Sequence, residues 1–227
     1  MIHKAALRAM VAGCLLMGMG SGPALGGPGQ AEALVEKIEK AFSDTVAMKA
    51  RFTQKVENKK FNDLRHASGT LAILKPSMMR WEYAEPSELL IVADGEKLWY
   101  YDKAANSVSS EPLQGYMGPR SPLLFLAGKE PLSKVFQVSV VDDGTGQPTA
   151  SLKLVPREPV NGLKGVLLKV ETGSYIIREV IMVDFLGNRN SVSFSGVETA
   201  AALDKSMFKF TPPAGVDVQP AAKAPGL

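Results

Sequence analysis

The chain has 227 residues, with 26 Lys and Arg against 23 Asp and Glu, a formal net charge of +3. Such a weak positive balance gives no case for nucleic acid or an anionic membrane as the main partner. The length is enough for a single domain with a sizeable core.

The N-terminal segment has the pattern of a secretory signal peptide. Lys4 and Arg8 make a positive start, and residues 9–19 are apolar or small throughout. This apolar run is too short to span a membrane, and small residues follow it at a cleavage-like spacing. We therefore expect residues 1–26 to be removed during export to the periplasm, leaving residues 27–227 as one domain.

An alternative starts from the single cysteine of the chain. Cys14 follows Val11, Ala12 and Gly13, which resembles the lipidation motif of bacterial lipoproteins. The apolar run continues past Cys14, which favours its removal with the signal peptide. The mature chain then has no cysteine, and no disulfide, thiolate nucleophile or cysteine metal site is possible.

A helix is expected at the start of the mature chain, over Ala31–Met48. Its apolar residues Leu34, Val35, Ile38 and Phe42 recur at helical spacing between charged residues, which indicates an amphipathic helix. After this helix the pattern changes to short strands separated by turn residues. The expected strands, in chain order, are ARFTQKVEN, SGTLAILKP, MRWEYAEP, ELLIVADG, EKLWYYD, KVFQVSVV, TASLKLVP, GVLLKVET, SYIIREVIMVDF and NSVSFSGVE.

A proline-rich segment interrupts the strands. Within it, Ser121 and Pro122 suit a helix start and Gly128 suits a helix end, so we expect a short apolar helix over Pro122–Ala127. The Pro- and Ala-rich end, residues 219–227, is predicted to be a mobile tail.

The residues needed for catalysis do not converge in the sequence. Without His3, which leaves with the signal peptide, His66 is alone in a polar turn. A catalytic triad or a zinc site would need partners that the chain does not supply. We therefore expect no enzyme activity, no metal and no cofactor.

The predicted fold is mainly β: an unclosed antiparallel barrel of about ten or eleven strands with a helical lid over an apolar cavity. The alternative, that the apolar side chains simply fill one another as a core, fits the pattern equally well. The candidate cavity residues come from the third to fifth strands and the lid: Met79, Trp81, Leu90, Val92, Leu98, Tyr100, Leu123 and Phe125.

Several short motifs also resemble a known family. In chain order they are Phe52-x-Gln54, Gly69-x-Leu71, Lys75-Pro76, Arg80-Trp81, Pro86, LLIVADG, LWYYD, SPLLFLAG and FKFTPPAGVDV. Each is weak alone, but together and in this order they resemble the periplasmic outer-membrane lipoprotein carrier proteins. The resemblance runs from Phe52 to Val218, most of the mature chain.

The resemblance implies a carrier without catalysis. Such a protein takes acylated lipoproteins from an inner-membrane ABC transporter and passes them to an outer-membrane acceptor lipoprotein; we expect it to be a monomer. The motifs add Trp99 to the candidate lipid-binding residues. They also place Lys75 where the family has an arginine that latches the lid, and lysine keeps the charge but loses the multi-donor fork.

Two other functions stay open from the sequence. A membrane-anchored acceptor lipoprotein would have Cys14 retained and lipidated. An envelope sensor or lipid-binding module could use the same fold to detect lipid, with a cargo other than lipoprotein.

Overall fold

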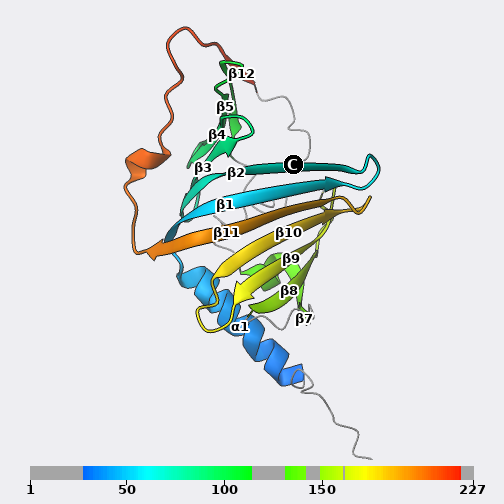
Figure 1. The fold of residues 1–227 in the computed structure, drawn as a ribbon. Coiled ribbons are helices and arrows are strands. Elements are labelled where there is room, and N and C mark those ends of the chain that lie inside the picture. Colours follow the sequence, from blue (N-terminus) through cyan, green and yellow to red (C-terminus); the bar gives the residue numbers. More distant parts are fainter. Residues whose placement is uncertain (1–27, 114–130, 142–148, 161, 221–227) are drawn as a thin grey trace, which may run out of the picture.

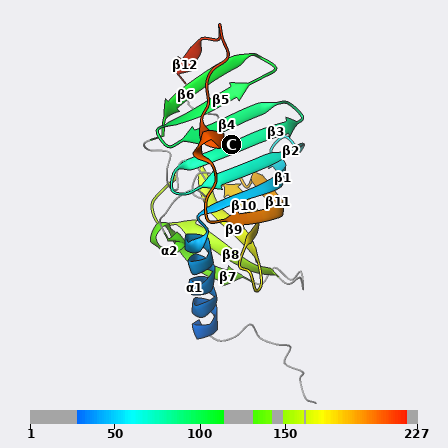
Figure 2. The ribbon, with the colours of Figure 1, turned by 90° about the vertical axis from the view of Figure 1, so that its left-hand side faces the viewer.

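The computed structural model describes residues 28–113, 131–141, 149–160 and 162–220. These residues form one curved sheet of twelve strands with a long helix at its lower end (Figure 1). The side view shows the strands stacked across the molecule, with α1 (Pro28–Asp44) beneath them (Figure 2).

The strands follow the chain in two groups. The first comprises β1 (Ala47–Asn58), β2 (Asp63–Leu74), β3 (Met78–Glu85), β4 (Leu89–Asp94), β5 (Lys97–Asp102) and β6 (Ser107–Pro112). The second comprises β7 (Phe136–Val141), β8 (Thr149–Pro156), β9 (Leu163–Glu171), β10 (Ile177–Asp184) and β11 (Arg189–Ala200), and β12 (Val218–Pro220) comes last.

The order of strands across the sheet is β12-β6-β5-β4-β3-β2-β1-β11-β10-β9-β8-β7. All neighbours pair antiparallel except β12, which pairs in parallel with β6. The long central pair of β1 and β11 joins the two groups. Because β12 and β7 are the two ends of this order, the sheet is unclosed, and the predicted open antiparallel barrel is confirmed.

Helix α1 ends earlier than the sequence pattern indicated. It stops at Asp44, where the Thr45 hydroxyl donates to the Ala41 carbonyl at 2.8 Å, and β1 already begins at Ala47. The predicted extension to Met48 is therefore wrong. Ile38 and Phe42 on the apolar stripe of α1 are buried in the core of the sheet. Neither described α-helix is long and apolar enough to cross a membrane.

The inner face of the sheet carries an aromatic cluster. The Phe52 ring lies 4.7 Å from Trp81 and 5.0 Å from Tyr83, and Phe194 lies 6.4 Å from Trp81. Phe52 pairs directly with Gly69, where an added Cβ would lie 2.9 Å from the Phe52 ring and 1.9 Å from the Glu82 carbonyl oxygen. A glycine is therefore required for β2 to approach β3.

The segment after β11 packs on the outer face of strands β1 to β5. This segment contains η2 (Lys205–Phe208), and Phe208 is fully buried against Ala47, Ala72 and Leu74. Phe210 then stacks on Trp99 and Tyr101, at 5.5 and 5.7 Å.

The structure also contains elements that the sequence pattern did not predict. Strand β6 and helix α2 (Leu132–Val135) were not expected. Residues 219 and 220, predicted to belong to a mobile tail, pair instead with Ser109 and Ser110 of β6. The predicted helix Pro122–Ala127 lies outside the described residues.

Candidate functional site

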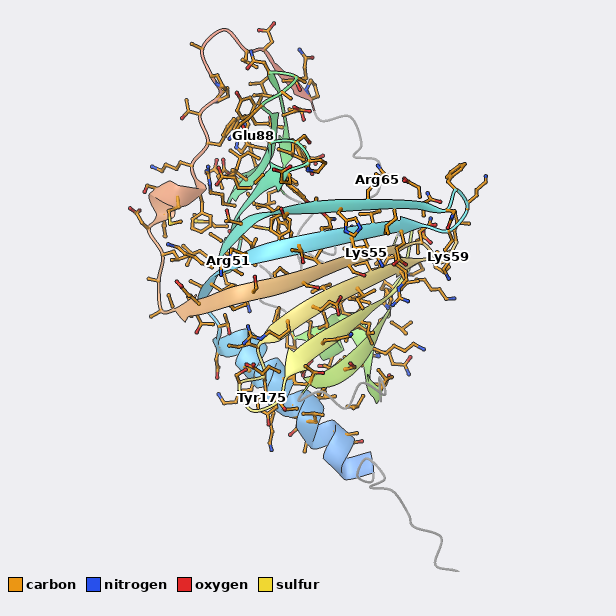
Figure 3. The ribbon with its side chains drawn as sticks, in the orientation of Figure 1. Arg51, Lys55, Lys59, Arg65, Glu88 and Tyr175 are labelled. Atoms are coloured by element: carbon orange, nitrogen blue, oxygen red, sulfur yellow. The ribbon has the colours of Figure 1, made fainter. Side chains whose placement is uncertain are left out.

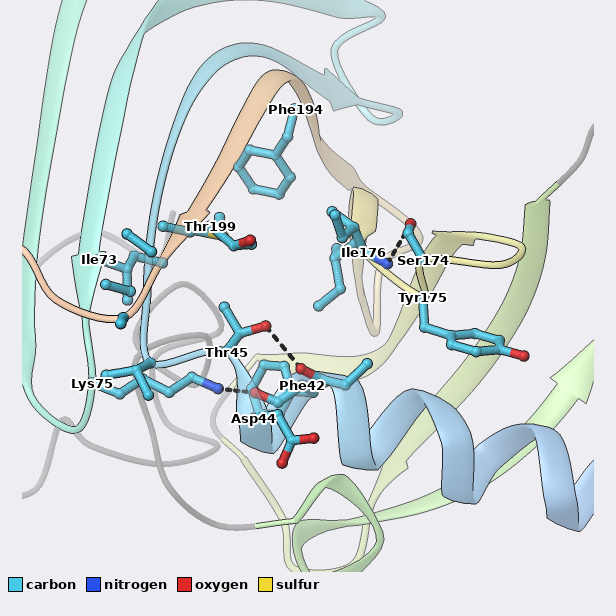
Figure 4. A pocket seen from close by; sticks show the side chains of 17 residues that line it. Phe42, Asp44, Thr45, Ile73, Lys75, Ser174, Tyr175, Ile176, Phe194 and Thr199 are labelled. Atoms are coloured by element: carbon cyan, nitrogen blue, oxygen red, sulfur yellow. Dashed lines mark hydrogen bonds between the residues drawn. The ribbon is translucent and has the colours of Figure 1, made fainter.

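An apolar pocket of about 580 Å³ opens at one end of the sheet (Figure 4). Four stretches of the chain meet there: the end of α1 with the start of β1, the end of β2, the turn from β9 to β10, and β11 with the residue after it. The volume is in the range of small-molecule sites.

Most of the pocket wall is carbon. The lining residues are Ala41, Phe42, Asp44, Thr45, Val46, Ala47, Met48, Ile73, Lys75, Ser174, Tyr175, Ile176, Ile177, Phe194, Thr199, Ala200 and Ala201. The polar members come from the end of α1, the turn, Lys75 and Thr199, and in the turn Ser174 accepts from the Ile176 backbone amide at 3.2 Å (Figure 4). The pocket therefore suits an aliphatic ligand whose polar end stays near the rim.

Lys75 is the charged group that reaches across the pocket rim to the helix. It comes directly after β2, and its ammonium donates to the Phe42 carbonyl and lies 3.6 Å from the centre of the Phe42 ring. Burial lowers the pKa of the Lys75 amine to about 8. The carbonyl and the ring both favour the protonated form, so proton loss weakens this contact.

A second polar contact holds the middle of α1. The Glu39 carboxylate accepts from the Ser133 hydroxyl of α2 at 3.1 Å. Thus α1 is tied to β2 through Lys75 and to α2 through Glu39. Next to Glu39, Ile38 is fully buried in the core.

Four of the predicted cavity residues share the inner face. Direct partners in an antiparallel pair lie on one face, and the pairing places Met79, Trp81, Leu98 and Tyr100 with the core cluster. Met79 pairs with Ile73 of the pocket wall, and Trp81 contacts Phe194 of the same wall. These two residues back the pocket without lining its open space.

Three other predicted residues lie on the opposite face, so their grouping with Trp81 is wrong. Leu90 and Val92 alternate with Ile91 and Ala93, which are the inner residues of β4. Trp99 pairs with Val92 and donates to Asp94 at 2.7 Å. Leu90 and Val92 belong to an apolar run that is buried on both faces, so alternation alone could not assign them. Trp99 is half-buried on the neighbouring strand β5.

The Asp94 carboxylate organises this part of the outer face. Burial would raise its pKa, but the hydrogen bonds from the Lys97 amide, the Trp99 indole and the Glu96 amide outweigh burial and hold the pKa below its usual value. The Trp99 indole is therefore fixed beside a charged carboxylate, a poor surface for an acyl chain.

The remaining predicted residues, Leu123 and Phe125, lie outside the described part of the chain. The sequence pattern missed several pocket residues, above all Phe194 and the turn Ser174–Ile177. Phe194 was detectable as an apolar position of NSVSFSGVE, whereas the turn carries no motif.

The exposed side chain of His66 lies on β2, where it pairs with Lys55. In the described ranges, no three His, Cys, Asp or Glu side chains are grouped as a metal site would need.

Comparison with known proteins agrees with the fold. Residues 43–211 match the protein family described as outer membrane lipoprotein carrier protein LolA. The chain belongs to this family. The outer-membrane lipoprotein carrier protein of Dechloromonas aromatica is 33% identical over 184 residues, covering 81% of this chain and 86% of the relative. That of Methylobacillus flagellatus is 32% identical, covering 81% and 87%. The resemblance seen in the sequence is thereby confirmed.

Solved structures share the fold at low identity. An uncharacterized conserved protein from Thermus thermophilus superposes with a TM-score of 0.50 at 14% identity, covering 84% of this chain and 98% of that chain.

Proposed function

We propose that this protein is a periplasmic carrier that binds the acyl chains of lipoproteins and transports them from the inner to the outer membrane. Two lines of support meet: the chain belongs to the outer membrane lipoprotein carrier family, and its pocket is lined mainly by apolar side chains between α1 and the sheet. The pocket is the observation that carries the proposal.

The chemistry required of a carrier is burial without reaction. Each methylene removed from water contributes about 0.8 kcal/mol, so an acyl chain does not cross an aqueous space unaided at a useful rate. An apolar wall such as Ile73, Ile177 and Phe194 supplies this burial. The proposal assigns no catalytic step to any residue and needs no cofactor.

Release requires that the pocket can open. In this proposal helix α1 is the lid, since its last turn lines the pocket and the helix is tied down by two polar contacts, Lys75 to Phe42 and Glu39 to Ser133. The short helix expected over Pro122–Ala127 would cover the cavity from a part of the chain that the structure does not describe. In this proposal Lys75 is the latch, reaching α1 with a single ammonium group.

The proposed partners follow from the same role. They are acylated lipoproteins, an inner-membrane ABC transporter that loads the carrier, and an outer-membrane acceptor lipoprotein that unloads it. The signal peptide over residues 1–26 would direct the chain to the periplasm. If Cys14 were instead retained and lipidated, the protein would be an anchored acceptor, and mass spectrometry of the mature N-terminus separates the two.

Native mass spectrometry of the protein purified from periplasm tests the proposal. We expect a co-purified acylated protein, identified after denaturation. A variant with Ile177→Asp should lose it, whereas Val155→Asp, an exposed change on β8, should retain it. Phospholipid or glycolipid as the only cargo would move the function to another lipid, and an empty protein that takes up no lipoprotein from membranes would contradict it.

A further inference from the structure

The exposed apolar side chains of the molecule are concentrated at two hairpin ends. In the described part of the chain, the most exposed large hydrophobic residues are Leu186 at 75% and Phe61 and Phe185 at 71% each. Phe61 is in the turn between β1 and β2, and Phe185 and Leu186 are in the turn between β10 and β11. Leu64, at 49%, is beside Phe61 at the start of β2.

The two turns lie side by side. Strand β1 pairs with β11, so that Glu57 at the end of β1 is opposite Arg189 at the start of β11. The Lys59 backbone amide donates to the Asn188 side chain at 2.9 Å, which links one turn to the other. Both hairpins project at the same end of the sheet (Figure 1), and Lys59 is at that end in Figure 3.

Side-chain to backbone hydrogen bonds inside each turn fix its conformation. The Asp184 carboxylate accepts from the backbone amides of Leu186 and Asn188 at 2.9 and 2.8 Å. The Asn58 side chain accepts from the amide of Phe61 at 3.3 Å. The apolar side chains are thus presented outward by ordered turns that bury none of them.

Basic residues surround the apolar tips. Lys55 and Arg65 form ion pairs with Glu57 and Asp63. Lys59, Lys60 and Arg189 form no salt bridge with any described carboxylate. The Lys60 ammonium lies 5.5 Å from the centre of the Phe61 ring. Aromatic and aliphatic side chains beside basic groups are the composition of segments that lie on lipid surfaces.

We propose that this hairpin-tip patch, formed by Phe61, Phe185 and Leu186 with Lys59, Lys60 and Arg189, binds the surface of a membrane that contains anionic phospholipid. The net charge of the whole chain gives no hint of this partner, because the basic groups are concentrated locally. The apolar tips enter the headgroup region, and the three cations pair with lipid phosphates.

The size of the patch favours lipid over a protein partner. Three large side chains supply on the order of 400 Å², whereas a stable protein interface needs about 800 Å² on each side. A lipid surface needs no complementary shape. The patch lies at the opposite end of β1, β10 and β11 from the apolar pocket, so membrane contact here leaves the pocket end unobstructed.

Vesicle flotation of the mature protein, cleared of cargo, tests the proposal without depending on lipoprotein transport. We expect the protein to float with vesicles of phosphatidylethanolamine and phosphatidylglycerol, and to float weakly with vesicles of phosphatidylcholine. The triple change Phe61→Ser, Phe185→Ser, Leu186→Ser should reduce binding at least tenfold, or about 1.4 kcal/mol. The matched pair Val155→Ser, Val218→Ser, at exposed apolar positions elsewhere, should bind as the parent does.

A second variant keeps the test independent of folding. Lys59→Gln with Lys60→Gln leaves the apolar tips intact and should weaken binding about fivefold for each charge removed, with a smaller dependence on salt. Absence of flotation, or flotation unaffected by both tip variants, would overturn the proposal. A third result would also overturn it: binding to native membranes that depends on the tips, is abolished by protease treatment of the membranes and is not reproduced with pure lipid. That result would make the tips a protein-binding site. Transport could fail while flotation succeeds, or the reverse, so this test and that of the carrier function are separable.

Discussion

Strands β3 to β5 carry other parts of the molecule on both of their faces, and the two faces differ in what covers them. On the inner face, Trp81 and Met79 pack against the wall of an apolar pocket and, beyond it, helix α1. On the outer face, Trp99 is covered by Phe210 of the C-terminal segment. In the proposed function the inner face opens when α1 moves, whereas the outer face is covered by a segment that also adds strand β12 to the sheet. Substitutions on the two faces should therefore separate a binding face from a purely structural one.

The largest expected effect is on the inner face. Trp81→Ala removes a fully buried ring from the centre of the aromatic cluster and should lower the free energy of unfolding by about 3–5 kcal/mol. Trp99→Ala, at a half-buried position, should cost less, roughly 1–2 kcal/mol. Denaturant titration of both variants measures the difference, and equal costs would contradict the assignment of the faces.

The outer segment should matter for stability but not for cargo. Phe208→Ala removes a fully buried side chain from the contact with Ala47, Ala72 and Leu74 and should cost roughly 3 kcal/mol. Below its unfolding temperature, this variant should still bind acylated cargo with parental affinity. A loss of binding in the folded variant would show that the outer face takes part in the site.

A charge in the pocket should weaken cargo binding but change stability little, the reverse of the expectation for Phe208→Ala. Ile177→Asp puts a carboxylate at the half-buried pocket wall, where it should weaken cargo binding tenfold or more, because the acyl chain would desolvate the charge. The loss of stability should be small, since the position opens toward solvent. A binding assay with a fluorescent fatty acyl probe, alongside thermal unfolding, separates the two quantities.

The effect of the Lys75 latch should depend on pH. Burial lowers the pKa of Lys75 to about 8 from the ordinary 10.5, so between these values the unfolded chain binds more protons than the folded one. The stability contribution of Lys75, relative to a Lys75→Met variant, should therefore rise as pH increases from about 8 to about 10.5. Over the same range the ammonium loses its contact with Phe42, so α1 should exchange its amide hydrogens more freely than expected from the intrinsic pH dependence.

In Lys75→Arg the side chain stays charged across this range, so both pH dependences should disappear. Denaturant titrations and hydrogen exchange at matched pH values measure the two effects. A parental pH profile in the Lys75→Arg variant would contradict the role given to this lysine.

The sequence predicted the β meander well because its signals are local. The alternation of Met79, Trp81 and Tyr83 against Arg80 and Glu82 is confirmed, as is the shared face of Phe52 and Gln54. Strand β6 was missed because SVSSEP is short, polar and ends in proline, and it is a strand here because β5 and β12 pair with it on both sides.

The pocket was harder to predict because it depends on tertiary contacts. In LLIVA both faces are buried, so the inner role of Ile91 and the outer role of Leu90 follow only from pairing with Trp81 and Glu82. The turn Ser174–Ile177 and the residues after β11 meet α1 across more than a hundred residues of chain, and no local pattern encodes that meeting.

Site-specific photocrosslinking to an acylated lipoprotein tests the central claim most directly. A photoreactive amino acid replaces Ile73 or Ile177 in the pocket wall, or Trp99 on the outer face, and the carrier is loaded with its cargo. The account predicts crosslinks from both pocket positions to the acyl chains and none from position 99. Crosslinks from position 99, or none from the pocket in a carrier shown to be loaded, would contradict it.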